Sequence, residues 1–181
     1  MWGLSEAALP LMKALAEEFQ ASVSLGERDR DQMVIVQRSE AMGILRMNLH
    51  VGSGLPLVIS SLGRACLAAM DETERAAALT LLRDLTPAAD WPAAQTGVTQ
   101  SLADLQAHGC VFNLGESHRE IHAIGIPVPA GGVRGRRLAL TCGGARSLLS
   151  RNTLVRTLAP RLIELAARIA PLIDAARRPG G

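Results

Sequence analysis

Aromatic residues are scarce in this 181-residue chain: they make up 2% of it, and tyrosine is absent. Those present are far apart in the sequence, at Trp2, Phe19, Trp91 and Phe112. Proteins that bind single-stranded nucleic acid stack the bases on clustered aromatic side chains. The composition therefore excludes a stacking surface of that kind.

Lysine is nearly absent as well, because Lys13 is the only one and arginine supplies the other basic residues. Nineteen basic residues against 17 acidic ones give a formal net charge of +2, with both signs mixed along the chain. Two short arginine clusters lie at 134–137 and 177–178, and a solvated loop and a solvated tail are the ordinary interpretation of such clusters. No concentrated basic face for nucleic acid is predicted.

Cysteine occurs at three distant positions, Cys66, Cys110 and Cys142, without any CxxC spacing. An odd number of scattered cysteines indicates free thiols in a reducing, cytoplasmic compartment. No run of about 18 or more apolar residues is free of charge, so no membrane-spanning segment is predicted. The first 20 residues also lack the basic start and long uncharged apolar stretch of a secretory signal.

The composition is that of a globular protein, with 48% hydrophobic and 20% charged residues, and the length fits one domain over 1–181. Apolar periodicity divides the chain into a first helix (5–20), a sheet region (21–143) and a C-terminal helix (150–178). Within the sheet region, strands are predicted at 22–27, 33–37, 43–49, 111–114, 121–128 and 137–142. Helices are predicted there at 60–70, 71–83 and 99–108, with loops at 52–56 and 86–95. The short connections predict an α+β fold with an antiparallel six-stranded sheet flanked by helices.

Patterns for catalysis are weak throughout. His118 and His122 have the i,i+4 spacing of two metal ligands on a helix, but the surrounding residues read as a loop entering a strand and do not match HExxH. Cys142 lies at a strand end without a neighbouring base, which favours a buried thiol. We therefore expect no enzyme activity, no metal and no cofactor.

A glycine-rich loop and an apolar run lead into a helix that opens at Ser60-Ser61-Leu62-Gly63. The first N–H groups of a helix lack partners inside the helix and carry the positive end of its dipole, so they can receive a carboxylate. The alternative is that Ser60 or Ser61 simply caps its own helix.

Three spaced segments carry a further signal. The first is GSGLPLVISSLGRACLA at 52–68, which resembles the pattern G-x-x-x-P-x-x-x-x-x-x-G-K-A-x-L-A and differs from it only at Arg64. The second joins Leu105–Gly109 to Glu116 and to IGIPV at 124–128, and the third is LALTCG at 138–143. Together they resemble the C-terminal effector-binding domain of the IclR family of bacterial transcription regulators, and Pro160 and Ala166 fit its closing helix.

The resemblance implies a GAF-like fold and a domain that senses a small organic molecule, often a carboxylic acid, with self-association into a dimer or tetramer. Family members carry a winged helix-turn-helix DNA-binding domain ahead of this one. No such module fits before Ser5, so DNA binding is expected only through an N-terminal domain absent from this chain.

The resemblance also implies a ligand pocket, position by position. Backbone amides at Ser61 and Leu62 would receive the ligand, and the strands and loops would supply Met47, Leu55, Asn113, Ile121, Ala123, Leu140 and Cys142. Strand alternation independently places residues 121 and 123 on one face of their strand, and residues 140 and 142 on one face of theirs.

This chain departs from the family pattern at Arg64 in place of lysine, Gly125 in place of alanine and Cys142 in place of serine. Leu140 and Ala123 suggest few polar side chains in the pocket. The predicted effector is therefore a carboxylate with an apolar body, an aromatic one included. Two other functions remain open: a dimerisation module with a vestigial pocket, and a thiol-dependent GAF-like enzyme.

Overall fold

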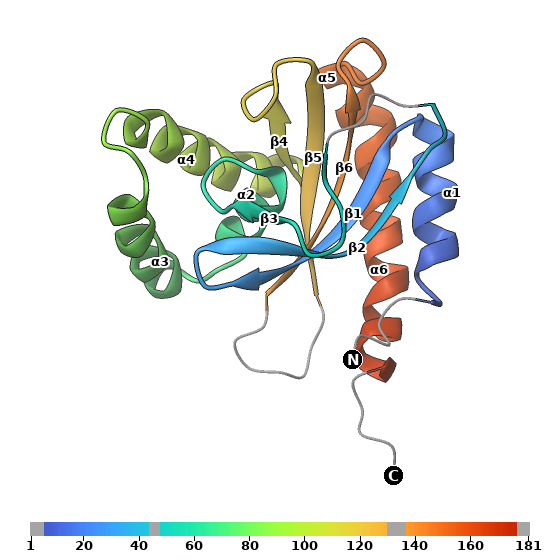
Figure 1. Cartoon of the computed structure of the whole chain (residues 1–181), viewed down its shortest axis with the longest axis horizontal. Helices are drawn as coiled ribbons and strands as arrows, with labels where there is room; N and C mark the ends of the chain where they lie inside the picture. Colours follow the sequence, from blue (N-terminus) through green and yellow to red (C-terminus); the bar gives the residue numbers. More distant parts are fainter. Residues whose placement is uncertain (1–5, 44–47, 130–136, 177–181) are drawn as a thin grey trace.

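A curled six-stranded antiparallel sheet forms the centre of the computed structural model, which describes residues 6–43, 48–129 and 137–176 (Figure 1). The strands lie in the order β3-β2-β1-β6-β5-β4. They are β1 (Ser22–Asp29), β2 (Gln32–Glu40), β3 (Gly54–Pro56), β4 (Val111–Leu114), β5 (Ile121–Val128) and β6 (Leu138–Ala145). The predicted α+β class with a six-stranded antiparallel sheet is confirmed.

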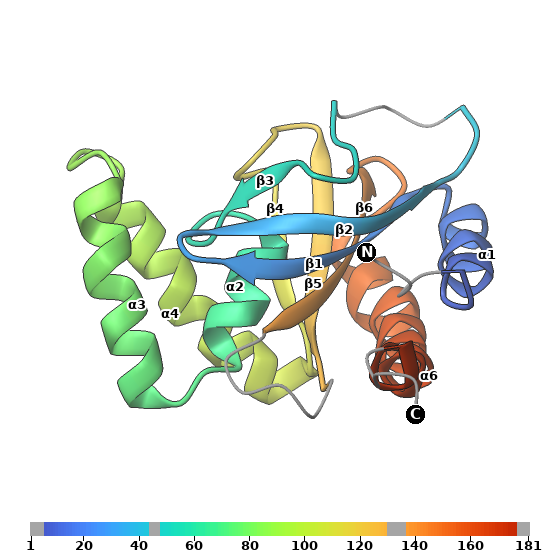
Figure 2. The same cartoon turned by 60° about the horizontal axis from the view of Figure 1, so that its bottom comes forward.

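Helices cover both faces of this sheet (Figures 1 and 2). The first face carries α1 (Leu9–Phe19) and α6 (Ala159–Ala176), and the opposite face carries α2 (Ser61–Ala68) with α3 (Glu72–Leu85) and α4 (Trp91–His108) beside it. A short helix, α5 (Arg151–Thr153), and a π-helical turn (Leu154–Leu158) lead into α6. None of the described helices is both long and apolar enough to cross a lipid bilayer.

Each face of the sheet buries its own hydrophobic cluster, and strand alternation decides which residues join which cluster. On β1, Val23 and Leu25 pack into the cluster shared with α1 and α6. Gly26, on the other face, lies against Leu62 of α2. The antiparallel register pairs Leu25 with Leu140 and Ser24 with Thr141. Residues that lie on one face of the sheet on β1 therefore pair with residues on the same face on β6.

Several predicted helix ends are confirmed by their hydrogen bonds. Ser60 caps α2 by accepting the Gly63 N–H at 3.0 Å, and Asp71 caps α3 by accepting the Glu74 N–H at 2.7 Å. Gly109 ends α4 in the left-handed conformation, with φ of 72°. The Glu74 side chain does not complete a capping box. It pairs with Arg137 instead, and that hydrogen bond raises the arginine's pKa.

Two element boundaries differ from the sequence prediction. The stretch 86–95 was expected to be a loop, yet α4 already begins at Trp91, because Pro92 lies in the first helical turn, where its missing N–H costs nothing. The 52–56 loop contains the short edge strand β3, which pairs with β2. Most of the strand predicted at 43–49 lies outside the described residues.

The C-terminal helix is interrupted near Pro160. The π-helical turn ends at Leu158, two residues before this proline. A proline ring clashes with the carbonyl four residues earlier in a regular helix, and a wider turn relieves that clash.

The start of α2 lies directly on β5 because Gly125 has no side chain. A Cβ atom at Gly125 would lie 2.3 Å from the Ser61 carbonyl oxygen, a backbone atom that cannot move without shifting the helix. The contact therefore sets how closely α2 approaches the sheet.

Replacing Gly125 with alanine should lower the free energy of unfolding by about 1–3 kcal/mol, the usual cost of overpacking a core. Gly144→Ala is the matched control on β6, because its added Cβ would meet its nearest atoms at 3.3 Å. Urea unfolding of both variants measures the difference. Equal losses in the two variants would contradict the role assigned to Gly125.

Candidate ligand-binding site

A cavity of about 90 Å³ lies between the start of α2, the sheet and the turn that follows β4. A single water needs only about 10–15 Å³ on the same measure, so the cavity accommodates a small organic molecule. The residues that line it are Ser22, Arg38, Leu49, Leu55, Ser60, Ser61, Asn113, Ser117, His118, Ile121, Ala123, Thr141, Gly143 and Gly144.

Five of the residues predicted for the pocket line this cavity: Leu55, Ser61, Asn113, Ile121 and Ala123. They come from β3, the start of α2, β4 and β5. The structure thus brings together residues that lie up to 68 positions apart in the chain. Met47, also predicted for the pocket, lies outside the described residues.

The side chains of Leu62, Leu140 and Cys142 do not line the cavity. Leu140 and Cys142 are fully buried in the cluster beneath α1 and α6, and Leu62 is fully buried between α2 and the sheet. For Leu140 and Cys142, the β5–β6 register explains why they face away from the cavity. It pairs Ala123 with Gly143 and Gly125 with Thr141, so the odd-numbered residues of β6 share the cavity face.

Sequence reasoning missed most of the polar lining. Thr141 and Gly143 could have been found from the pairing of β5 with β6, because cross-strand partners share a face. Ser22 and Arg38 enter the cavity only because β1 and β2 continue the sheet beyond β6. The expectation of few polar side chains is therefore wrong, because eight of the lining residues carry a polar side chain.

The start of α2 supplies a hydrogen-bond donor to the cavity at Ser61. Ser60 caps the helix, as the simpler sequence interpretation held, but its hydroxyl accepts only the Gly63 N–H. Within the described part of the chain, no hydrogen bond engages the N–H groups of Ser61 and Leu62. Both N–H groups are therefore unpaired at the positive end of the helix dipole, but only Ser61 lines the cavity.

Hydroxyl groups on the sheet and on α2 supply hydrogen-bond acceptors to the cavity. Thr141 donates its hydroxyl proton to the Ile124 carbonyl at 2.8 Å. The Ser61 hydroxyl lies 2.6 Å from that of Thr141, and it must be the donor, because a hydroxyl has one proton to give. Ser22 similarly donates to the Gly143 carbonyl at 3.3 Å. The Oγ atoms of Ser61 and Ser22 are left as acceptors.

Arg38 brings a cation to the cavity lining, with a side chain only 9% exposed. Its Nε and Nη2 atoms each lie 2.9 Å from one Glu40 oxygen, and Nη1 donates to the Ser24 hydroxyl at 2.7 Å. Glu40 therefore offsets the charge of this arginine while its position is fixed by three contacts.

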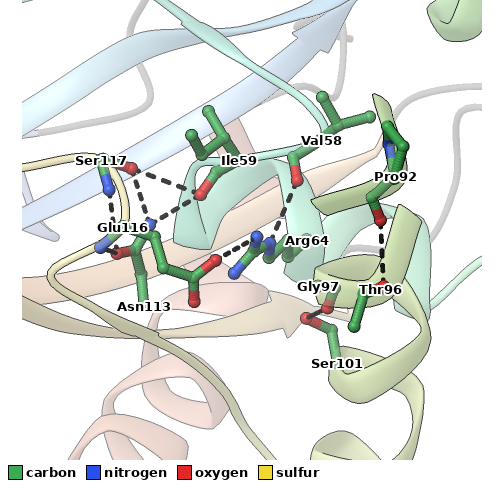
Figure 3. Close-up of polar contacts among 10 residues, drawn as sticks. All are labelled: Val58, Ile59, Arg64, Pro92, Thr96, Gly97, Ser101, Asn113, Glu116 and Ser117. Atoms are coloured by element: carbon green, nitrogen blue, oxygen red, sulfur yellow. Dashed lines mark hydrogen bonds and ion pairs between the residues drawn. The ribbon is translucent and has the colours of Figure 1, made fainter. Parts of the chain in front are cut away.

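Asn113 lines the cavity, but its hydrogen-bonding capacity is already used (Figure 3). Its amide donates to the Ile59 carbonyl and to the Ser117 hydroxyl, each at 2.6 Å. Its oxygen accepts the N–H groups of Glu116 and Ser117. An asparagine side chain has two donor hydrogens and two acceptor lone pairs, so Asn113 shapes the cavity wall and has no bond left for a ligand.

The three thiols lie in apolar surroundings that hold them protonated. Burial raises the pKa of Cys66 and of Cys110 to about 11 each, and that of Cys142 to about 12. Only a thiolate is nucleophilic, so all three are unreactive near neutral pH. Across 6–43, 48–129 and 137–176 no three His, Cys, Asp or Glu residues form a group that could hold a metal ion.

Comparison with known proteins identifies a family. Residues 2–170 match the family model described as the C-terminal domain of the bacterial transcriptional regulator IclR. A curated relative, the HTH-type transcriptional regulator TsaQ1/TsaQ2 of Comamonas testosteroni, is 26% identical over 132 residues, which are 71% of this chain. The chain spans about half of that relative's length, because the match covers 47% of it.

Solved structures agree on the fold. An IclR-family regulator from Brucella abortus is 35% identical, with a TM-score of 0.85, over 94% of this chain and 64% of its own. The inducer-binding domain of PobR from Acinetobacter, solved as a double mutant with 3-hydroxybenzoic acid, is 19% identical. Its TM-score is 0.69, over 92% of this chain and 97% of its own. The family-model match spans nearly the whole chain, and the chain therefore belongs to the IclR family of bacterial transcriptional regulators, whose C-terminal effector domain it contains.

Proposed function

We propose that the cavity beneath α2 binds a small carboxylic acid that also carries a hydroxyl group, and that this binding regulates transcription. The single observation that carries the proposal is the polarity of the cavity. A free backbone donor lies at Ser61, and the Oγ atoms of Ser61, on α2, and of Ser22, on β1, are left as acceptors.

Each part of such a ligand has a complementary group in the cavity. The carboxylate would accept from the N–H group of Ser61, where the helix dipole favours negative charge. A hydroxyl on the same molecule would donate to the Oγ of Ser61. The side chains of Leu49, Leu55 and Ile121 would contact its hydrocarbon body. The PobR domain that shares this fold was crystallised with an acid of this class, 3-hydroxybenzoic acid.

Regulation requires that the ligand bind two states of the domain, or of its oligomer, with different affinity. A coupling of about 1–3 kcal/mol between ligand and DNA sites is typical of allosteric proteins. In this proposal the domain associates with itself as a dimer or tetramer, and an N-terminal winged helix-turn-helix domain binds the DNA.

The two alternatives predict different behaviour. A dimerisation module with a vestigial pocket would bind no metabolite in this cavity. A thiol-dependent enzyme would need a thiolate, and the raised pKa values of all three thiols disfavour it.

A calorimetric comparison of matched acids tests the ligand class. The hydroxylated acid of each pair, 3-hydroxybenzoate against benzoate and lactate against pyruvate, should bind about fivefold more tightly, since one hydrogen bond contributes roughly 1 kcal/mol. At least one of the two pairs should show this preference. Equal affinity within both pairs would contradict the predicted acceptor, and no binding of any of the four acids would favour the vestigial pocket.

Replacing Thr141 with valine should weaken the preference for a hydroxyl group. Without Thr141 Oγ1 as its acceptor, the Ser61 hydroxyl proton becomes free to donate, so pyruvate, whose keto oxygen can accept it, gains affinity relative to lactate. Thr141→Ser is the matched control, because it keeps the hydroxyl and should keep the preference. A Thr141→Val protein with an unchanged affinity ratio for lactate and pyruvate would count against this hydrogen-bond assignment.

The thiols should resist alkylation in the folded protein. Their pKa values of about 11 to 12 leave them almost entirely protonated at pH 8, so iodoacetamide should modify none within an hour, whereas all three should react in urea. Mass spectrometry counts the added groups. Rapid modification of one thiol in the native protein would revive the thiol-dependent alternative.

A further inference from the structure

The turn that follows β4 forms one wall of the cavity and is held from two sides (Figure 3). On the cavity side, Asn113 and Ser117 both donate hydrogen bonds to the carbonyl of Ile59, the residue that precedes the α2 cap. These contacts join the turn to the loop ahead of α2. The side of the turn that faces away from the cavity is held by a different contact.

On that other side, Glu116 forms an ion pair with Arg64 of α2. The Arg64 Nη2 lies 2.6 Å from the Glu116 Oε2, and the arginine Nε donates to the Val58 carbonyl at 3.1 Å. Arg64 is only 2% exposed, whereas Glu116 is 46% exposed. A buried guanidinium is costly without a carboxylate partner, so the pair holds Glu116 firmly against α2.

The neighbouring helix α4 has a glycine where it contacts this arginine. A Cβ atom at Gly97 would lie 2.1 Å from the Arg64 Nη2, so the guanidinium rests directly on the helix backbone at this glycine. Glycine in the middle of a helix costs about 1 kcal/mol relative to alanine. Contact with Arg64 gives a physical reason for a glycine at this position.

We propose that the Arg64–Glu116 ion pair is the positioning contact of the ligand site. It fixes the turn from behind, and thereby holds Asn113, Ser117 and His118 in place as a wall of the cavity. Neither charged group lines the cavity itself. The effect of the ion pair on ligand affinity rests on the function proposed above, whereas its effect on the order of the turn does not.

Glu116→Gln should loosen the turn specifically. The N–H groups of Glu116 and Ser117 both donate to Asn113 Oδ1, so their hydrogen-exchange protection reports directly on the turn. We expect protection at these two amides to fall by at least about fivefold, as in a local opening, after correction for global stability. The matched control is Glu120→Gln, because Glu120 pairs with the exposed Arg146 and makes no ion pair with α2.

A double variant separates positioning from stability. Arg64→Met combined with Glu116→Gln removes both charges, which often restores stability lost by breaking one partner of a buried pair. The turn should nevertheless stay loose, and Arg64→Lys should give an intermediate protection, because one ammonium group cannot replace both guanidinium contacts. A double variant that regains full protection would overturn the proposal, because the pair would then contribute only to stability.

Affinity is measured with 3-hydroxybenzoate as the probe. Its dissociation constant should rise about fivefold in Glu116→Gln and stay unchanged in Glu120→Gln, since misplaced contacts lose the binding free energy of about one hydrogen bond. If Glu116→Gln loosens the turn while affinity is unchanged, the positioning role is overturned. If the wild-type chain does not bind the probe, the proposed ligand class fails, and exchange at the turn still decides whether the ion pair positions it.

Discussion

The contact between the start of α2 and the strands β5 and β6 governs both the packing and the candidate site. Gly125 lets the Ser61 backbone approach β5, and the Ser61 hydroxyl binds Thr141 on β6. These contacts bring the unpaired Ser61 N–H group to the same cavity as the hydroxyl groups of Ser22 and Thr141 on the sheet. Without the close approach, the helix start would open to solvent, where water competes for the same donors and weakens the field of the helix dipole.

Much of the fold could be predicted from the sequence because it follows from local rules. Alternating apolar residues marked β1, β5 and β6, and single polar residues such as Ser60 and Asp71 marked helix starts through one hydrogen bond each. The site was harder, because it depends on register. Placing 140 and 142 on a shared face was correct, but only the pairing of Ala123 with Gly143 shows that the cavity lies on the other face.

Other parts of the site could not be inferred from local patterns. Arg38 reaches the cavity through a sheet order in which β1 lies between β2 and β6. Asn113 lines the cavity, yet its role depends on four hydrogen bonds to residues of two separate segments. A sequence shows that such a side chain is polar, whereas only the assembled structure shows whether its hydrogen bonds are already used.

The buried arginine connects these observations. Without a carboxylate partner, a guanidinium buried between helices would destabilise the fold. Replacing a buried ion pair with well-packed apolar residues is often neutral or stabilising. The contacts of Arg64, taken together, give a reason for an arginine at this position. Arg64 joins the loop before α2, the backbone of α4 and the turn after β4. Three segments that share no backbone hydrogen-bond ladder are thereby fixed relative to one another at one point. A planar group with several fixed donors can do this, whereas an apolar side chain can fill the space but cannot orient the turn that borders the cavity.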